Sequence, residues 1–156
     1  MMRHLILVLF VAFFATLQSC DNCRNLDCLN GGECVDGRCE CAEGYQGETC
    51  QQQERDKFLA DFEATETCLF TNNPPPLQIS AGDDISEINI SGLYRYYSGT
   101  VTAVVNDAIF DIPAQDFGGS VISGSGELSS TTLTINYVIR GSGNYDECQV
   151  VAEKIF

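Results

Sequence analysis

Nine cysteines are the residues with the most chemical potential in this chain of 156 residues. Cysteine can bind zinc, attack a substrate or form a disulfide. His4 is the only histidine, and it lies in the first few residues, which disfavours both a Cys/His zinc site and a nucleophile–histidine pair. So many cysteines in a short chain instead indicate disulfides, which persist outside the reducing cytosol.

Paired carboxylates are the remaining candidates for catalysis. Asp83 and Asp84 are adjacent, and Asp107 lies four residues before Asp111. Such pairs could serve as general acid and base, and a weak hydrolase is therefore one alternative. They fall in turn-rich segments, where little burial is expected to tune a pKa. We therefore expect the protein not to be an enzyme.

An aromatic cluster is a candidate for binding. Tyr94, Arg95, Tyr96 and Tyr97 are consecutive. They could form a loop surface for a protein partner or a glycan, or pack along an edge strand. Asn89-Ile90-Ser91 also matches an N-glycosylation acceptor, which matters only in a eukaryotic cell.

The charge balance limits the partners. The chain has 22 acidic and 8 basic residues, a formal net charge of −14. Nucleic acids and anionic lipid surfaces need cationic neutralisation, so we expect neither as a partner. No motif indicates a cofactor or a metal.

The N-terminal segment resembles an export signal. Residues 5–17 are apolar, too short for the ~20 residues that span a bilayer, and Arg3 precedes them. A buried core helix is the alternative. Leu17-Gln18-Ser19-Cys20 resembles the lipobox of bacterial lipoproteins, although Gln18 departs from the usual small residue.

This resemblance implies that residues 1–19 are removed and that Cys20 carries a diacylglycerol and an acylated amine. Several acyl chains anchor a protein stably. The expected location is then the cell envelope, membrane-bound and extracytoplasmic. Ordinary signal-peptidase cleavage and secretion is the alternative. Lipidation of Cys20 would leave eight cysteines, an even number that can pair completely.

Six of these cysteines form one block with the spacing C-x4-C-x5-C-x4-C-x-C-x8-C over residues 23–50. Spacing alone allows fifteen pairings. The block resembles the EGF-like family, with Asn30-Gly31-Gly32 before the third cysteine and Gly44-Tyr45 before the last. The resemblance implies the pairs Cys23–Cys34, Cys28–Cys39 and Cys41–Cys50. A segment this short needs covalent links because it cannot bury a core.

Calcium binding is not expected in this module. Calcium-binding members of the family carry an acidic cluster before the first cysteine, whereas only Asp21-Asn22 stand there. The default role of an isolated EGF-like module is a spacer or a protein-contact surface.

The rest of the chain indicates a β domain over residues 58–156, after a polar linker over residues 51–57. Residues 131–139 alternate cleanly, which places Leu133, Ile135, Tyr137 and Ile139 on one face. Val101, Ala103 and Val105 alternate likewise, and Asn106-Asp107 resembles a two-residue hairpin turn. Further candidate strands lie at 58–70, 77–80, 85–90, 108–112, 119–128 and 149–155. The count of about eight predicts an antiparallel barrel or sandwich.

Cys68 and Cys148 lie in the first and last candidate strands. Pairing them would bring the two ends of a meander together, as closure of a barrel requires. Two free core thiols are the alternative.

The β domain also resembles, diffusely, small lipocalin-like domains of Bacteroidetes-type lipoproteins. Ile112-Pro113, the Gly-Ser-Gly segment within residues 123–126, and Thr134–Tyr137 carry this likeness. It implies fold more than function. We expect a membrane-anchored protein-interaction module, with a carrier of a small apolar ligand as the alternative.

Overall fold

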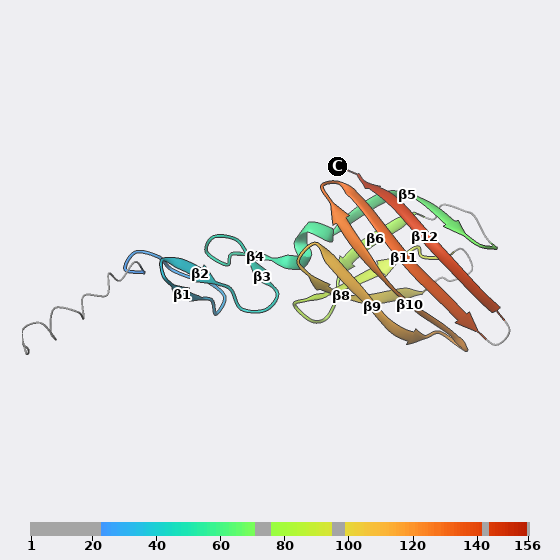
Figure 1. Cartoon of the computed structure of the whole chain (residues 1–156), viewed down its shortest axis with the longest axis horizontal. Helices are drawn as coiled ribbons and strands as arrows, with labels where there is room; N and C mark the ends of the chain where they lie inside the picture. The colour runs from blue at the N-terminus through green and yellow to red at the C-terminus, as the bar shows by residue number, and fades with distance from the viewer. Residues whose placement is uncertain (1–22, 71–75, 95–98, 142–143, 156) are drawn as a thin grey trace, which may run out of the picture.

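A computed structural model describes residues 23–70, 76–94, 99–141 and 144–155. The protein is mainly β, as predicted, and has two parts placed end to end: a slender N-terminal module and an eight-stranded barrel (Figure 1). The N-terminal segment and its Cys20 lie outside the described residues, as does Asp21-Asn22.

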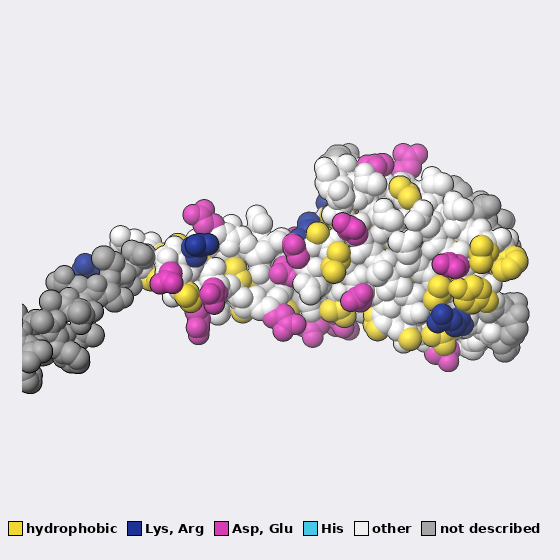
Figure 2. Space-filling view, viewed as in Figure 1, with side chains coloured by type: hydrophobic (Ala, Val, Ile, Leu, Met, Phe, Trp, Pro, Cys, Tyr) yellow, Lys and Arg dark blue, Asp and Glu magenta, His cyan; other side chains and the backbone are white. Residues whose placement is uncertain are grey.

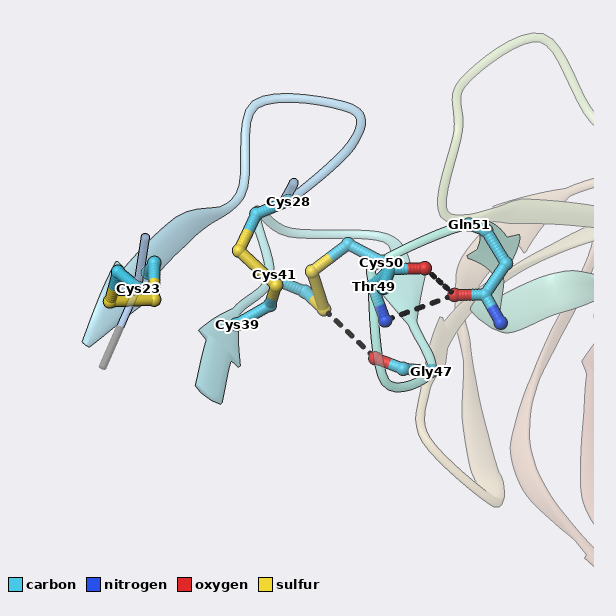
Figure 3. Close-up of a disulfide and its surroundings, with 9 residues drawn as sticks. Cys23, Cys28, Cys39, Cys41, Gly47, Thr49, Cys50 and Gln51 are labelled. Carbon is cyan, nitrogen blue, oxygen red and sulfur yellow. Dashed lines mark hydrogen bonds between the residues drawn. A yellow bond between two sulfur atoms is a disulfide. The ribbon is translucent and has the colours of Figure 1, made fainter. Parts of the chain in front are cut away.

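The N-terminal module contains two small hairpins. Strand β1 (Glu33–Val35) pairs with β2 (Arg38–Glu40), and β3 (Tyr45–Gln46) pairs with β4 (Gln52–Gln53). Three disulfides follow one another along it, as Figure 3 shows, and they are the pairs that the family resemblance implies. These are Cys23–Cys34, Cys28–Cys39 and Cys41–Cys50.

Residues 51–57 are not the irregular linker that their polar composition predicts. They form β4 and most of a 3-10 helix, η2 (Glu54–Phe58). Phe58, predicted to begin a strand, instead ends this helix and is fully buried. Its ring packs edge-on against that of Phe110, with 5.5 Å between the ring centroids. One apolar side chain therefore anchors an otherwise polar segment to the barrel core.

Eight antiparallel strands form the closed barrel, so of the two predicted architectures the barrel is the one that forms. Each strand pairs with its neighbour in sequence, and pairing of β12 with β5 closes the wall. The strands are β5 (Ala60–Cys68), β6 (Leu77–Ala81), β7 (Glu87–Ser91), β8 (Thr100–Asn106), β9 (Ile109–Asp116), β10 (Ser120–Ser129), β11 (Thr132–Gly141) and β12 (Asn144–Lys154).

The predicted alternation of side chains is confirmed in the barrel wall. Leu133, Ile135, Tyr137 and Ile139 of β11 all point inward and are buried, as do the three alternating residues of β8. The interior is filled by apolar side chains from every strand and from η2. They include Phe58, Phe62, Leu77, Ile79, Ile88, Ile90, Val101, Phe110, Ile122, Leu133, Ile135, Tyr137 and Val150.

Two inward-facing glycines make room for large side chains. A Cβ atom on Gly126 would stand 2.2 Å from Cζ of Phe110, and one on Gly124 would stand 2.7 Å from Cβ of Tyr137. Both glycines belong to the Gly-Ser-Gly segment singled out in the sequence. Their role is steric: they allow an aromatic residue of the neighbouring strand to lie across them.

Two hairpin details differ from the prediction. The turn between β8 and β9 is Asp107-Ala108, one residue later than predicted, because Asn106 still pairs with Ile109. Asp107 takes the left-handed conformation, with φ of 52°, which aspartate tolerates better than most residues. Strand β9 also continues past Pro113. There the side-chain amide of Gln115 takes the place of backbone pairing with β8: its Oε1 accepts from Thr102 N at 2.9 Å, and its Nε2 donates to Thr102 O at 2.7 Å.

The module and the barrel meet through a polar joint. Arg55 of η2 donates to the carbonyl oxygens of Gly82, Asp84 and Glu87 in the β6–β7 connection. Gly44 of the module, with φ of +81°, lies against Ile85 so closely that a Cβ atom would stand 2.9 Å from Cγ2. Glycine is required at this position both for its conformation and for this approach.

No helix among the described residues has the length and apolarity needed to cross a membrane.

Candidate functional site

The end of the barrel furthest from the module, here called the distal end, gathers most of the unusual side chains. Strands β5, β7, β9 and β11 end there, while η2 and the β6–β7 connection lie at the opposite, proximal end (Figure 1). The distal end is therefore the part of the barrel most removed from the N-terminal module.

The Cys68–Cys148 disulfide lies near the distal end. The two cysteines are directly opposite each other in the pairing of β5 with β12, and both are buried. The predicted pairing across the closure of the barrel is confirmed. Asp146 lies close enough to complete a three-residue ligand set with them, but the disulfide occupies both sulfurs.

Asp146 is a buried carboxylate that shapes the distal end. Its Oδ1 accepts hydrogen bonds from the backbone N–H groups of Leu69 at 3.0 Å, Phe70 at 3.3 Å and Glu147 at 3.0 Å. Three N–H donors compensate for burying a charge. The carboxylate thereby fixes the chain where it leaves β5.

Glu66 is the second buried acid, 2% exposed, and it points into the barrel from β5. The Tyr137 hydroxyl donates to its Oε1, as does the backbone N–H of Tyr94 at 3.0 Å. Its Oε2 atom is buried and has no hydrogen-bond partner among the residues that the structure describes. Burial, then the hydrogen bond from the hydroxyl to Glu66, raise the pKa of Tyr137 well above its usual range. Tyr137 therefore stays a neutral donor to Glu66, and Glu66 in turn ties Tyr94, which follows β7, to the interior.

Exposed hydrophobic side chains complete the distal end. Leu69 and Phe70 are 62% and 78% exposed, and Tyr145 is 45% exposed. The Arg140 guanidinium lies over the Tyr145 ring, 5.9 Å from its centroid. We call Leu69, Phe70, Arg140 and Tyr145 the distal tip. Figure 2 shows hydrophobic side chains gathered at this end of the barrel, beside basic and acidic ones.

The predicted aspartates lie elsewhere and are exposed. Asp83 and Asp84 belong to the β6–β7 connection at the proximal end, and Asp107 and Asp111 belong to the β8–β9 hairpin. The hydrogen bond and charge of Lys57, 2.9 Å away, lower the pKa of Asp107. Asp84 accepts from the N–H of Ile85 within its turn, at 2.7 Å, and the exposure of all four carboxylates agrees with their turn-rich sequence context.

Other predicted candidates are only partly described. Tyr94 is half-buried and its backbone N–H donates to Glu66, while residues 95–98, which hold the rest of that aromatic cluster, are outside the described residues. The amide of Asn89 is engaged, since it donates to Ala81 O at 3.3 Å and accepts from Thr102 Oγ1 at 3.2 Å.

Two hollows of the described barrel lie on its outer wall. The larger, about 540 Å³, extends over β10, β11, β12 and the end of β5, and the smaller, about 280 Å³, over β9, β10 and β11. The interior between these strands is occupied by the apolar side chains of the core.

Glu66 and Asp146 were missed as site residues, although the sequence contains a signal for both. Inward positions in β5 alternate through Phe62, Ala64, Glu66 and Cys68, and Asp146 lies two residues before Cys148. Because side chains two residues apart in a strand point to the same side, counting back by two from Cys68 and Cys148 would have placed both acids inside the barrel. The loops that they bond could not be identified from the sequence.

No protein-family model matches this sequence, and no curated protein matches it.

Proposed function

We propose that the protein is a non-catalytic binding protein of the cell envelope, anchored in the membrane by lipid on Cys20 and exposed outside the cytoplasm. The observation that carries this proposal is the distal tip, where hydrophobic side chains are exposed at the end furthest from the anchor. Exposed apolar groups rimmed by polar residues are typical of protein-interaction sites. We further propose a protein partner for this tip.

The module and the joint support the role of a spacer. Three disulfides fix the module internally, and Arg55 bonds three carbonyl groups of the barrel. The distal tip is then held away from the membrane on a stiff arm. Tyr145 and Arg140 are of the residue types that supply most of the binding energy at interfaces, and Phe70 is of a type enriched there.

Both buried acids have structural partners, which supports binding over catalysis. Asp146 accepts three backbone N–H groups, and Glu66 accepts the Tyr137 hydroxyl and the N–H of Tyr94. Each holds a distal loop in place. They act as supports beneath an exposed surface.

Mass spectrometry of the N-terminal peptide from the native host tests the anchor. The expected result is an acylated, diacylglyceryl-modified Cys20, and Cys20→Ser should move the protein from the membrane to the soluble fraction. An unmodified residue at or before Cys20 overturns the lipoprotein assignment.

A photo-crosslinking amino acid at position 70 tests the tip in living cells. The expected result is a discrete protein adduct at position 70 and none at position 80, since Ser80 is exposed on β6 near the opposite, proximal end of the barrel. Equal labelling at both positions, or no adduct at position 70, contradicts the tip as a partner surface.

A further inference from the structure

A straight row of uncharged polar side chains crosses four strands on the outer wall. Ser125 lies opposite Asn136, Asn136 opposite Gln149, and Gln149 opposite Thr67. All four are exposed, and Gln149 Nε2 donates to Asn136 Oδ1 at 2.9 Å. We call these four residues the polar row. With strands about 4.8 Å apart, the row spans about 14 Å.

The polar row runs through both outer hollows. The larger hollow is lined by Thr67, Asn136 and Gln149, and the smaller by Ser125 and Asn136. Because Asn136 lines both, the two are neighbours along the row. We treat the two neighbouring hollows as one groove along the row, a shape that fits a chain of several units better than a single small molecule.

The charge of this wall differs from that of the whole chain. The protein carries a formal net charge of −14, yet the polar row contains no ionisable group. The face that carries β11 and β12 in Figure 1 is largely free of charged side chains in Figure 2, whereas acidic side chains line the module. At the distal end of the groove, Arg140 and Glu147 offset each other. At its other end, Asp111 and Glu127 add two carboxylates that can accept hydrogen bonds from hydroxyl groups and that disfavour an anionic ligand.

The backbone hydrogen-bonding groups of this wall are already paired within the barrel. Strands β10, β11 and β12 each pair with neighbours on both sides, so an extended peptide cannot be added to them as a further strand. Any ligand must be bound by side chains. The polar row offers two amides and two hydroxyls, each of which can both donate and accept hydrogen bonds.

We propose that the polar row binds a neutral oligosaccharide. Sugar hydroxyls need closely spaced donors and acceptors, which the two amides and two hydroxyls supply. The rim adds Leu69 and Val138 at one end and Ile109 at the other, which can contact the apolar faces of sugar rings. A protein interface would instead be centred on aromatic or arginine side chains, and serine is depleted there.

This inference goes beyond the proposed function, and it can fail independently because changes in the polar row leave Phe70 and Tyr145 untouched. The full-length protein, in a detergent without a sugar headgroup, is titrated calorimetrically with four soluble hexasaccharides. The probes are hexamers of β-1,4-glucose, α-1,4-glucose, α-1,6-mannose and β-1,4-N-acetylglucosamine. We expect at least one to bind with a Kd on the order of 1 mM or tighter.

The Asn136→Ala/Gln149→Ala double variant should weaken that binding at least tenfold. The Gln78→Ala/Ser80→Ala double variant is the matched control, because it removes an exposed amide and hydroxyl from β6, and it should bind unchanged. Circular dichroism confirms that both variants fold. Absence of binding to all four hexasaccharides, or binding that survives the double change in the polar row, overturns the proposal.

Discussion

The module and the barrel are stabilised by opposite means. Between residues 23 and 50, only Gly44 and Cys50 are buried, and three disulfides provide the cross-links. The barrel has a continuous apolar interior and a single disulfide among its described residues. Disulfides therefore take the place of a hydrophobic core in the module, whereas in the barrel the disulfide adds to a core that already exists.

The largest effect should follow loss of a module disulfide. Cys28→Ala/Cys39→Ala removes a link typically worth about 2–5 kcal/mol in a small domain, more than a nearly coreless segment can replace. We expect module amides to exchange hydrogen at unfolded rates while barrel amides stay protected. A module that keeps its protection would show that packing, not cross-linking, holds it.

A smaller effect is expected from the barrel disulfide. Cys68→Ala/Cys148→Ala opens a link across a sequence separation of 80, worth about 4.5 kcal/mol at most in the chain-entropy model. Because the core remains, the barrel should stay folded, with a lower free energy of unfolding in urea titration. Complete unfolding of this variant would contradict the contrast between the two parts.

A packing change inside the barrel should lower the free energy of unfolding by less than the loss of its disulfide. Gly126→Ala places a Cβ atom against the Phe110 ring, which cannot retreat because it packs on Phe58. We expect a loss of about 1–3 kcal/mol in the free energy of unfolding. Ser129→Ala, exposed in the same strand, is the control and should change it by less than about 0.5 kcal/mol.

The smallest effect concerns the Lys57–Asp107 ion pair at the joint. Because Lys57 lowers the pKa of Asp107 in the folded state, the stabilisation is present above the usual pKa of aspartate and is lost as pH falls through the lowered pKa. Asp107→Asn, which keeps the left-handed turn, should cost about 0–1 kcal/mol at neutral pH and nothing at strongly acidic pH. A pH-independent difference in urea denaturation would exclude the ion pair as the cause.

The predictable part of this fold is the part set by local periodicity. Alternation along β11 correctly identified its inward face, and the cysteine positions predicted closure of the barrel. The turn after Asn106 was misplaced by one residue because Asn106 and Asp107 are both good turn formers. The helical form of residues 54–58 was missed because only Phe58, at its end, is apolar.

Functional surfaces were harder to predict because they depend on register. Ser125, Asn136, Gln149 and Thr67 are far apart in sequence and carry no motif, yet strand pairing places them in one row. Local propensity cannot supply that alignment. The distal tip likewise depends on Asp146 fixing the chain at Leu69 and Phe70, a contact between distant segments.

The joint at Arg55 has a mechanical consequence. A swivel between the two parts would let the barrel sample many orientations and dissipate any pull on its far end. With one guanidinium bonded to three carbonyl groups of a single connection, the module and barrel instead turn together as one lever. A load applied at the distal tip would then reach the disulfide-linked module through η2 and the three bonds of Arg55.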